Sequence, residues 1–244
     1  MPLKARTTPE ASITKTEKGY LMKIPAGDSS AYRFAQIDDY FGLPRKKFPH
    51  HALTLSLRAR TSSSTIPGTW GFGLWNDPFG MSLGFGANRF RLPTLPNAAW
   101  FFGASNENHL SFGNKPANGF LAQSFCSPKF HASLIPAGLV LPFSAKTTRR
   151  MLGKVIAEDS STLSVDATQW HRYRLEWSRR RVAWYVDEVQ VFESSVSPNS
   201  PLGLVIWIDN QYAAFTPDGK ISFGVLESEE EWLEIEDLEM SNVN

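Results

Sequence analysis

The stretch from 169 to 194, QWHRYRLEWSRRRVAWYVDEVQVFES, constrains the fold more than any other part of the sequence. Apolar and polar residues alternate along three short runs, which is the pattern of β-strands with one buried face. The apolar positions of the three runs are Tyr173, Leu175, Trp177, Val182, Trp184, Val186, Val189 and Val191. A tight turn at Asp187-Glu188 separates the second run from the third, so the stretch predicts a meander of three antiparallel strands.

Further strands are predicted on both sides of this meander. The run 51–61, HALTLSLRART, alternates between leucines on one face and Thr, Ser or Arg on the other. Apolar residues make up 42% of the chain and aromatic residues 13%, which is enough for a substantial core. The other predicted strands are 69–76, 97–105, 107–114, 201–210, 220–227 and 231–240. An all-β fold follows from this pattern.

The domain organisation predicted from the sequence is simple. Residues 1–18 are polar and are expected to form a loose N-terminal arm, and residues 19–244 are expected to form a single domain. The segment 119–159 interrupts the β pattern, because it is apolar, irregular and broken by three prolines. Its end, 147–159, predicts a short helix. On one side of this predicted helix lie Met151, Leu152, Val155 and Ile156. The segment has three alternative roles: core filling, a lid over a ligand site, or a dimer interface.

Charge and cysteine content exclude several classes of function. The net charge of +1 gives no general attraction to nucleic acid or to acidic membranes. Cys126 is the only cysteine, so no internal disulfide forms, and an inert, partly buried thiol is expected. The N-terminal residues lack the apolar core of a signal peptide, and no run approaches the ~20 apolar residues of a membrane span. A cytoplasmic protein is the resulting expectation.

The predicted meander carries a family resemblance. WHRYRLEWSRRRVAWYVDEVQVF resembles the W-H-x-Y-x-L-E-W and V-x-W-Y-V-D-G motifs of the concanavalin A-like lectin/glucanase superfamily, in particular family 16 glycoside hydrolases. The order of the aromatic GLW strand, the apolar strand at 201–210 and the closing LEIEDLEM is similar to that family. The resemblance covers roughly residues 50–240. It implies a jelly-roll sandwich of two curved antiparallel sheets, with ligands bound across the concave sheet.

The same family carries its hydrolytic residues in an E-x-D-x-E strand, and that pattern has no counterpart here. Retaining chemistry needs two carboxyl groups ~5 Å apart. The corresponding region, 97–109, contains Glu107 as its single carboxylate. Glu234 and Glu236 are also spaced by two, but they alternate with apolar positions and are expected on a wet outer face. The resemblance therefore implies the fold, whereas standard retaining hydrolase activity is not expected.

Candidate ligand-binding residues are aromatic side chains close to polar ones. An aromatic ring can pack on the apolar face of a sugar, while amides and carboxylates bind its hydroxyl groups. The predicted stacking residues are Trp70, Trp75, Trp100 and Trp207. The predicted hydroxyl-binding residues are Asn76, Asp77, Asp209 and Asn210. Asp38-Asp39-Tyr40 is a third polar group of this kind. Turn formation is the alternative role for all of these polar residues.

Three functions remain open at this point. The first is a carbohydrate-binding or glycoside-hydrolase-like protein that lacks the usual hydrolytic carboxylates. The second is an enzyme acting on a small apolar substrate in a lidded cleft, with Asp77, Asp209 or Glu107 as general acid or base. The third is an interaction domain that forms a homodimer through 119–159. No metal, cofactor, nucleic acid or membrane partner is expected from the sequence motifs.

Overall fold

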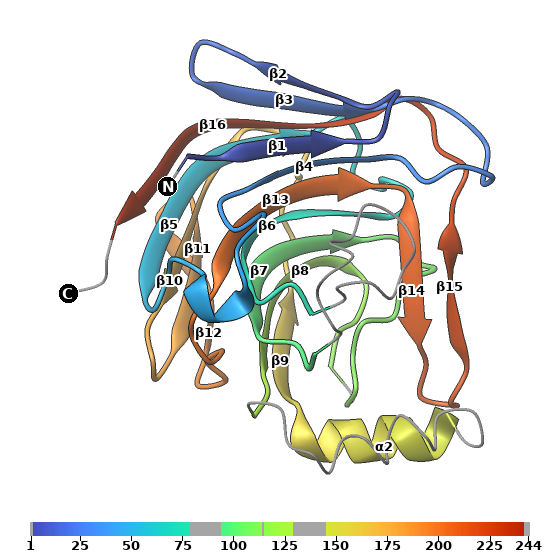
Figure 1. Cartoon of the computed structure of the whole chain (residues 1–244), viewed down its shortest axis with the longest axis vertical. Coiled ribbons are helices and arrows are strands. Elements are labelled where there is room, and N and C mark those ends of the chain that lie inside the picture. Colours follow the sequence, from blue (N-terminus) through green and yellow to red (C-terminus); the bar gives the residue numbers. More distant parts are fainter. Residues whose placement is uncertain (1, 79–93, 114, 129–144, 242–244) are drawn as a thin grey trace.

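Two antiparallel sheets of seven strands stack face to face and form a jelly-roll β-sandwich (Figure 1). The computed structural model describes residues 2–78, 94–113, 115–128 and 145–241. The strands of sheet A are, in spatial order, β1 (Lys4–Thr7), β4 (Phe34–Asp38), β13 (Gly203–Asp209), β6 (Thr69–Trp75), β7 (Ala98–Ala104), β8 (Gly119–Cys126) and β9 (Ala157–Thr162). The predicted all-β class is confirmed.

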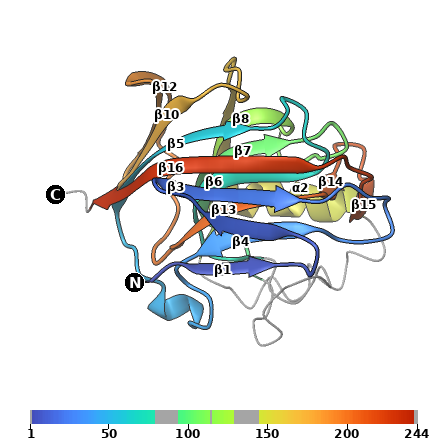
Figure 2. The same ribbon diagram turned by 90° about the horizontal axis from the view of Figure 1, so that it is seen from above.

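Sheet B packs against sheet A, and smaller elements lie around the pair. The strands of sheet B are β12 (Val189–Ser194), β11 (Val182–Val186), β10 (His171–Trp177), β5 (Leu53–Thr61), β16 (Glu231–Ser241), β3 (Gly19–Ile24) and β2 (Ser12–Lys15). The smaller elements are the 3₁₀ turn η1 (Arg45–Lys47), helix α2 (Ala145–Val155) and the ribbon of β14 (Gln211–Phe215) and β15 (Ile221–Val225). Figure 1 shows α2 below β9, and Figure 2 shows most strands of both sheets aligned along a similar axis.

The main hydrophobic core lies between the two sheets and follows the predicted alternation. The five inward residues of β5 are each 2% exposed or less, while their neighbours along the strand are half-buried. The predicted meander is confirmed as β10, β11 and β12, with Leu175 opposite Trp184. Trp177 and Trp184 are among the largest fully buried side chains. Because alternate residues of a strand point to opposite faces, one buried face per strand is enough to fix this packing.

Two predicted segments differ from the structure. Residues 1–18 are expected as a loose arm, yet β1 pairs with β4 and β2 pairs with β3. Both are edge strands with mostly exposed residues, so they lack the apolar alternation that identifies a strand. Where the predicted strand at 107–114 is described, at 107–113, the chain is instead a loop, with an isolated bridge from His109 to Ala214.

The predicted irregular segment 119–159 is regular where it is described. It supplies β8, helix α2 and the first half of β9. Strand β8 is buried on both faces over residues 121–125, so its sequence lacks the regular alternation of apolar and polar residues. The predicted helix is present, but Leu152 and Ile156 pack against other residues while Met151 and Val155 remain exposed. Residues 129–144 lie outside the described residues.

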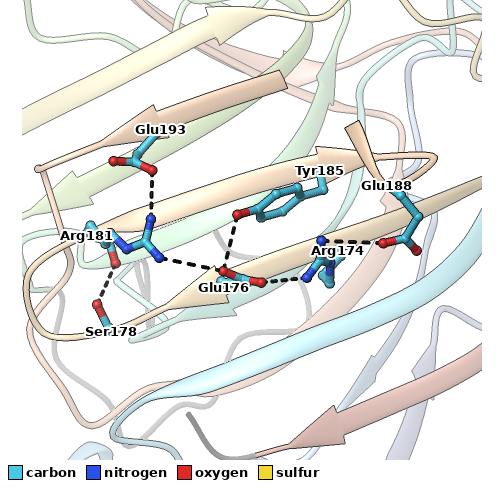
Figure 3. Close-up of polar contacts among 7 residues, drawn as sticks. All are labelled: Arg174, Glu176, Ser178, Arg181, Tyr185, Glu188 and Glu193. Carbon is cyan, nitrogen blue, oxygen red and sulfur yellow. Dashed lines mark hydrogen bonds and ion pairs between the residues drawn. The ribbon is translucent and has the colours of Figure 1, made fainter. Parts of the chain in front are cut away.

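The outer face of sheet B is a charged surface. Arg174 contacts Glu176 at 2.6 Å and lies over the ring of Tyr185, 4.0 Å from its centroid. Figure 3 shows how these side chains connect to Arg181, which contacts Glu193 at 2.8 Å. The predicted wet face of β16 is confirmed in the same sheet. Its ion pairs are Arg60 with Glu234 at 2.8 Å and Arg58 with Glu236 at 3.0 Å.

Candidate functional site

Glycines on β6 make room for tryptophans from both neighbouring strands on the outer face of sheet A, the face turned away from sheet B. Gly73 pairs with Trp100 of β7, and Gly71 pairs with Trp207 of β13. A β-carbon added at Gly71 would lie 2.9 Å from the Trp207 ring, and one at Gly73 would lie 2.6 Å from the Trp100 β-carbon. Each tryptophan therefore occupies space that a side chain on β6 would otherwise fill.

Trp75, Trp100 and Trp207 form an aromatic cluster on this outer face. The ring centroid of Trp75 lies 6.0 Å from that of Trp100 and 6.4 Å from that of Trp207, whose plane differs from its own by 4°. The Trp100 and Trp207 centroids are 5.5 Å apart. Trp100 is 4% exposed and Trp207 is 8% exposed, whereas Trp75 is half-buried. The structure thus brings together three of the four predicted stacking residues, and Trp75 is the most accessible of them.

Trp70 lies on the opposite face of β6 and belongs to the core between the sheets. Its ring stacks on that of Phe120, with centroids 4.8 Å apart, and lies across Gly103 of β7. The expectation that Trp70 and Trp75 contact one ligand is therefore corrected. The two residues are five positions apart, and an odd spacing in a strand places side chains on opposite faces.

Parts of the outer face around the cluster are covered by other segments. Tyr40 and Phe48, in the connection between β4 and β5, pack with ring centroids 4.8 Å apart. Over β8, Phe112 packs on Phe125 with centroids 6.2 Å apart, and Leu152 of α2 joins the same hydrophobic cluster. Helix α2 and the loop before β8 therefore cover the β8 side of the face. Helix α2 lies within the segment 119–159, and among the three roles expected for that segment this position is most like that of a lid.

The side-chain amides of Asn76 and Asn210 hold neighbouring loops in place. Asn76 Oδ1 accepts the N–H of Asn97 at 3.0 Å, and its Nδ2 donates to the carbonyl of Leu95 at 2.9 Å. Asn210 Oδ1 accepts the N–H of Arg33 at 2.8 Å, and its Nδ2 donates to two backbone carbonyls at 3.1 and 2.9 Å. A sugar hydroxyl would have to displace these bonds, so the geometry favours the alternative role of loop formation.

Asp209 connects to the aromatic cluster through Thr69. Its Oδ1 accepts the Thr69 hydroxyl at 2.8 Å, and the Thr69 oxygen accepts the indole N–H of Trp207 at 2.9 Å. Gln211 N–H also donates to Oδ1, and the Tyr32 hydroxyl donates to Oδ2 at 3.3 Å. Burial raises the pKa of Asp209 to about 7, and these hydrogen bonds limit the rise. Asp209 is therefore the predicted site residue that titrates near neutrality.

The two other candidate acids lie in different places. Asp77 directly follows Asn76 with a φ of 49°, and its carbonyl oxygen accepts a hydrogen bond from Arg45 Nη2 at 2.5 Å. Glu107 is exposed in the loop after β7 and lines a cavity at the end of the sandwich. Asp77 therefore lies at the end of β6 next to the cluster residue Trp75, while Glu107 belongs to another site.

The outer face of β7 carries apolar side chains. Its outward residues are Ala98, Trp100, Phe102 and Ala104. A further acidic network lies on β4, where Asp38 is bound by Arg6 at 2.9 Å and by the amide of Gln36 at 3.0 Å. Neither Gln36 nor Thr69 stands out in the sequence. The signal that could have found them is a contrast within the strand, because each is a polar residue at an outward position and its inward neighbours are apolar.

Within residues 2–78, 94–113, 115–128 and 145–241, no group of three or more His, Cys, Asp and Glu side chains is placed to bind a metal ion. Cys126 is half-buried at the end of β8, and burial raises the pKa of its thiol. A raised pKa disfavours the reactive thiolate. Among the described helices, none combines the length and apolar character needed to cross a membrane.

Solved structures similar to this chain include a family 16 glycoside hydrolase and a legume lectin-like protein. LamAcat from Zobellia galactanivorans gives a TM-score of 0.52 at 13% identity, over 91% of this chain and 77% of that one. A glycoside hydrolase family 16 endo-glucanase from Bacteroides ovatus gives 0.51 at 9% identity, over 98% and 94%. A legume lectin-like domain from Entamoeba histolytica gives 0.50 at 9% identity, over 99% and 90%. No protein-family model and no curated protein sequence matches the chain.

These likenesses establish the architecture. The chain has the fold seen in this family 16 endo-glucanase and in this legume lectin-like domain. Likenesses at 9 to 13% identity show the fold alone, so the chemistry has to follow from the residues themselves.

Proposed function

We propose that the protein binds a carbohydrate on the outer face of sheet A, with Trp75 as the principal stacking surface. The observation that carries this proposal is the half-buried ring of Trp75, which lies parallel to Trp207 and beside Trp100. A rigid aromatic surface suits the apolar C–H face of a sugar ring. The buried neighbours hold the Trp75 ring in place, which reduces the entropy lost on binding.

We also propose that this face performs no retaining glycoside hydrolysis. Such hydrolysis needs two carboxyl groups ~5 Å apart. Asp38 and Asp209 are the acidic residues on the outer face of β4 and β13, and the partner of Asp209 on β4 is Phe34. Phe34 and Asp38 are four positions apart along β4, which places their backbones about 13 Å from each other. Asp38 is also bound by Arg6. These positions support binding without the usual pair of hydrolytic carboxylates.

The choice of ligand for a first test follows from a structural neighbour. A LamA structure from Z. galactanivorans, with a TM-score of 0.51 at 13% identity, is in complex with laminaritriose and laminaritetraose. Laminaritriose is therefore a suitable probe. We expect saturable binding by calorimetry, and we expect Trp75→Ala to weaken it by about tenfold or more.

A matched control separates a binding role from a general loss of stability. Trp170 is also half-buried, but it lies beside Arg58 and Arg60 on the outer face of sheet B. Trp170→Ala should leave the affinity for laminaritriose unchanged. Absence of binding across a panel of glycans at millimolar concentration would contradict the proposed function.

A second candidate function is catalysis on a small apolar substrate. The observation that favours it is the raised pKa of Asp209. A carboxyl group with a pKa of about 7 can act as a general acid or base near neutral pH. The cover over β8 by Phe112 and Leu152 supplies apolar surroundings. Uptake of an apolar fluorescent probe that is lost in Leu152→Ser would support this function. Its absence would leave carbohydrate binding as the better account.

Dimerisation through the apolar segment is the remaining candidate. Met151 and Val155 of α2 are the observation that favours it, since they are 41% and 36% exposed. Exposed apolar side chains on one helix are typical of interaction surfaces. Light scattering tests this directly. A mass that rises with concentration, and that falls again in a Met151→Lys variant, would support a dimer, whereas a constant monomer mass would exclude it.

A further inference from the structure

A cavity of about 480 Å³ opens at one end of the sandwich, away from the aromatic cluster. Its walls come from the loop between β5 and β6, the loop after β7, the start of β8 and the segment after β15. This volume lies within the usual range for small-molecule sites. The cavity, called here the end cavity, brings together Trp70 and Glu107. The sequence patterns mark both as site residues, and neither belongs to the outer face of sheet A.

The apolar wall of the end cavity is a stacked pair of rings. Trp70 and Phe120 have centroids 4.8 Å apart and planes 26° apart. Trp70 is 4% exposed, and its indole nitrogen lies against Gly103, where an added β-carbon would be 2.0 Å away. Among the described residues, no hydrogen bond from this indole N–H is present. The nitrogen is not one of the fully buried polar atoms left without a partner in the described residues, so its N–H meets solvent and is available to a ligand in the cavity.

The charge of the end cavity is negative. Glu107 and Glu227 line it, and none of its lining residues is Lys, Arg or His. In the described part of the chain, neither carboxylate forms an ion pair or a hydrogen bond. Carboxylates elsewhere on the surface behave differently, since Glu234 contacts Arg60 and Glu193 contacts Arg181. Two carboxylates beside a cavity with aromatic walls and without a cation create a local field that favours a positively charged ligand.

We propose that the end cavity binds a small organic cation, a protonated amine attached to an aromatic or apolar body. The body packs against Trp70 and Phe120, and the ammonium group lies near Glu107 and Glu227. The indole N–H of Trp70 donates to an acceptor on the ligand, or to a water that the ligand carries. This site is separate from the outer face of sheet A, so it goes beyond the proposed carbohydrate binding and does not depend on it.

Benzylamine and benzyl alcohol form a matched pair of probes, because they have nearly the same shape and only the amine is charged at neutral pH. The full chain is titrated with each at low ionic strength, and the indole N–H signal of Trp70 is followed by NMR. We expect saturable binding of benzylamine, with an affinity about tenfold higher than that of benzyl alcohol. Glucose, titrated in the same way, should leave the Trp70 signal unchanged.

Variants test the role of the carboxylates. The double variant Glu107→Gln with Glu227→Gln keeps the shape of both exposed side chains and should weaken benzylamine binding about tenfold. The control double variant, Glu229→Gln with Glu239→Gln, removes two exposed charges outside the cavity and should leave the affinity unchanged. Equal affinities for amine and alcohol, binding of glucose alone, insensitivity to the Gln variants, or no saturable shift at Trp70 would each overturn the proposal.

Discussion

The outer faces of the two sheets have the same origin and opposite characters. Each face consists of the strand residues that alternate with the core residues between the sheets. On sheet B these residues form pairs of opposite charge, such as Arg174 with Glu176 and Arg60 with Glu234. On sheet A the corresponding positions hold Trp100 and Trp207, which are almost fully buried.

This difference separates a solvated, charged face from an aromatic one. An ion pair on an exposed face is compatible with water on all sides and contributes little to stability. Aromatic rings on an outer face need cover or a ligand, since a large exposed apolar surface is unfavourable. On sheet A, Tyr40 and Phe112 supply part of that cover, and Trp75 is left accessible. The contrast between the faces therefore supports the proposal that ligands bind on sheet A.

The largest expected difference between the faces comes from removing one tryptophan from each. Trp207→Ala should lower the free energy of unfolding by about 3–5 kcal/mol, since it deletes a ring packed among other rings. Trp232, half-buried beside Arg60 on sheet B, is the counterpart. Trp232→Ala should cost about 1 kcal/mol. Urea unfolding curves measure both, and equal losses would remove the distinction between the faces.

Asp209 should make the stability of the protein depend on pH. Its folded pKa of about 7 lies above that of an unfolded Asp, near 3.9. Between about pH 4 and 7 the unfolded chain has released this proton while the folded chain keeps it. The contribution of Asp209 therefore falls as the pH rises, by at most about 1.4 kcal/mol per unit. Asp209→Asn should remove this slope. Identical pH profiles of unfolding for the two proteins would show that Asp209 titrates normally.

Replacing a glycine of β6 should change the stability by an intermediate amount. Gly71→Ala should destabilise the protein by about 1–3 kcal/mol, because the new methyl group would lie 2.3 Å from the Phe101 carbonyl and 2.9 Å from the Trp207 ring. Ser56→Ala, at a half-buried outward position of β5 in sheet B, should change stability by less than about 0.5 kcal/mol. Thermal unfolding of the two variants provides the comparison. A neutral Gly71→Ala would mean that the Trp207 ring can move aside without loss.

The smallest effect is expected in the charged network of sheet B. Glu176→Gln removes the carboxylate between Arg174 and Arg181 (Figure 3) and should cost at most about 1 kcal/mol. The loss should shrink further in high salt, since these groups are partly exposed to solvent. Denaturant unfolding at low and high salt checks both statements. A loss as large as that of Trp207→Ala would contradict the view of this face as a solvated surface.

Local alternation explains what the sequence predicts correctly and what it does not. The strands β5, β10 and β11 are clear in the sequence because each buries one face only. The edge strands β1 and β2 are missed, since neither has a well-buried face. Cross-strand packing is also invisible in a single strand. That Gly73 faces Trp100 depends on the register between β6 and β7, which no local pattern reports.

The candidate site is predicted in part for the same reason. Trp75, Trp100 and Trp207 lie within strands that the sequence identifies, so their meeting on one sheet follows once the order of the strands is known. Asn76 and Asn210 have the residue types of a binding site, but their amides are bonded to the backbone of loops distant in sequence. A residue type reports capacity for hydrogen bonding, and only the tertiary fold decides which partner uses it.

The most direct test of the central claim is an NMR titration of the indole N–H signals with laminaritriose. Each tryptophan gives a separate signal, so the experiment reports which face of the sandwich meets the ligand. Binding on the outer face of sheet A predicts saturable shifts for Trp75 and Trp207, with Trp170 and Trp232 unchanged. Shifts confined to Trp170 and Trp232, or no shift of Trp75 at saturating sugar, would contradict the account.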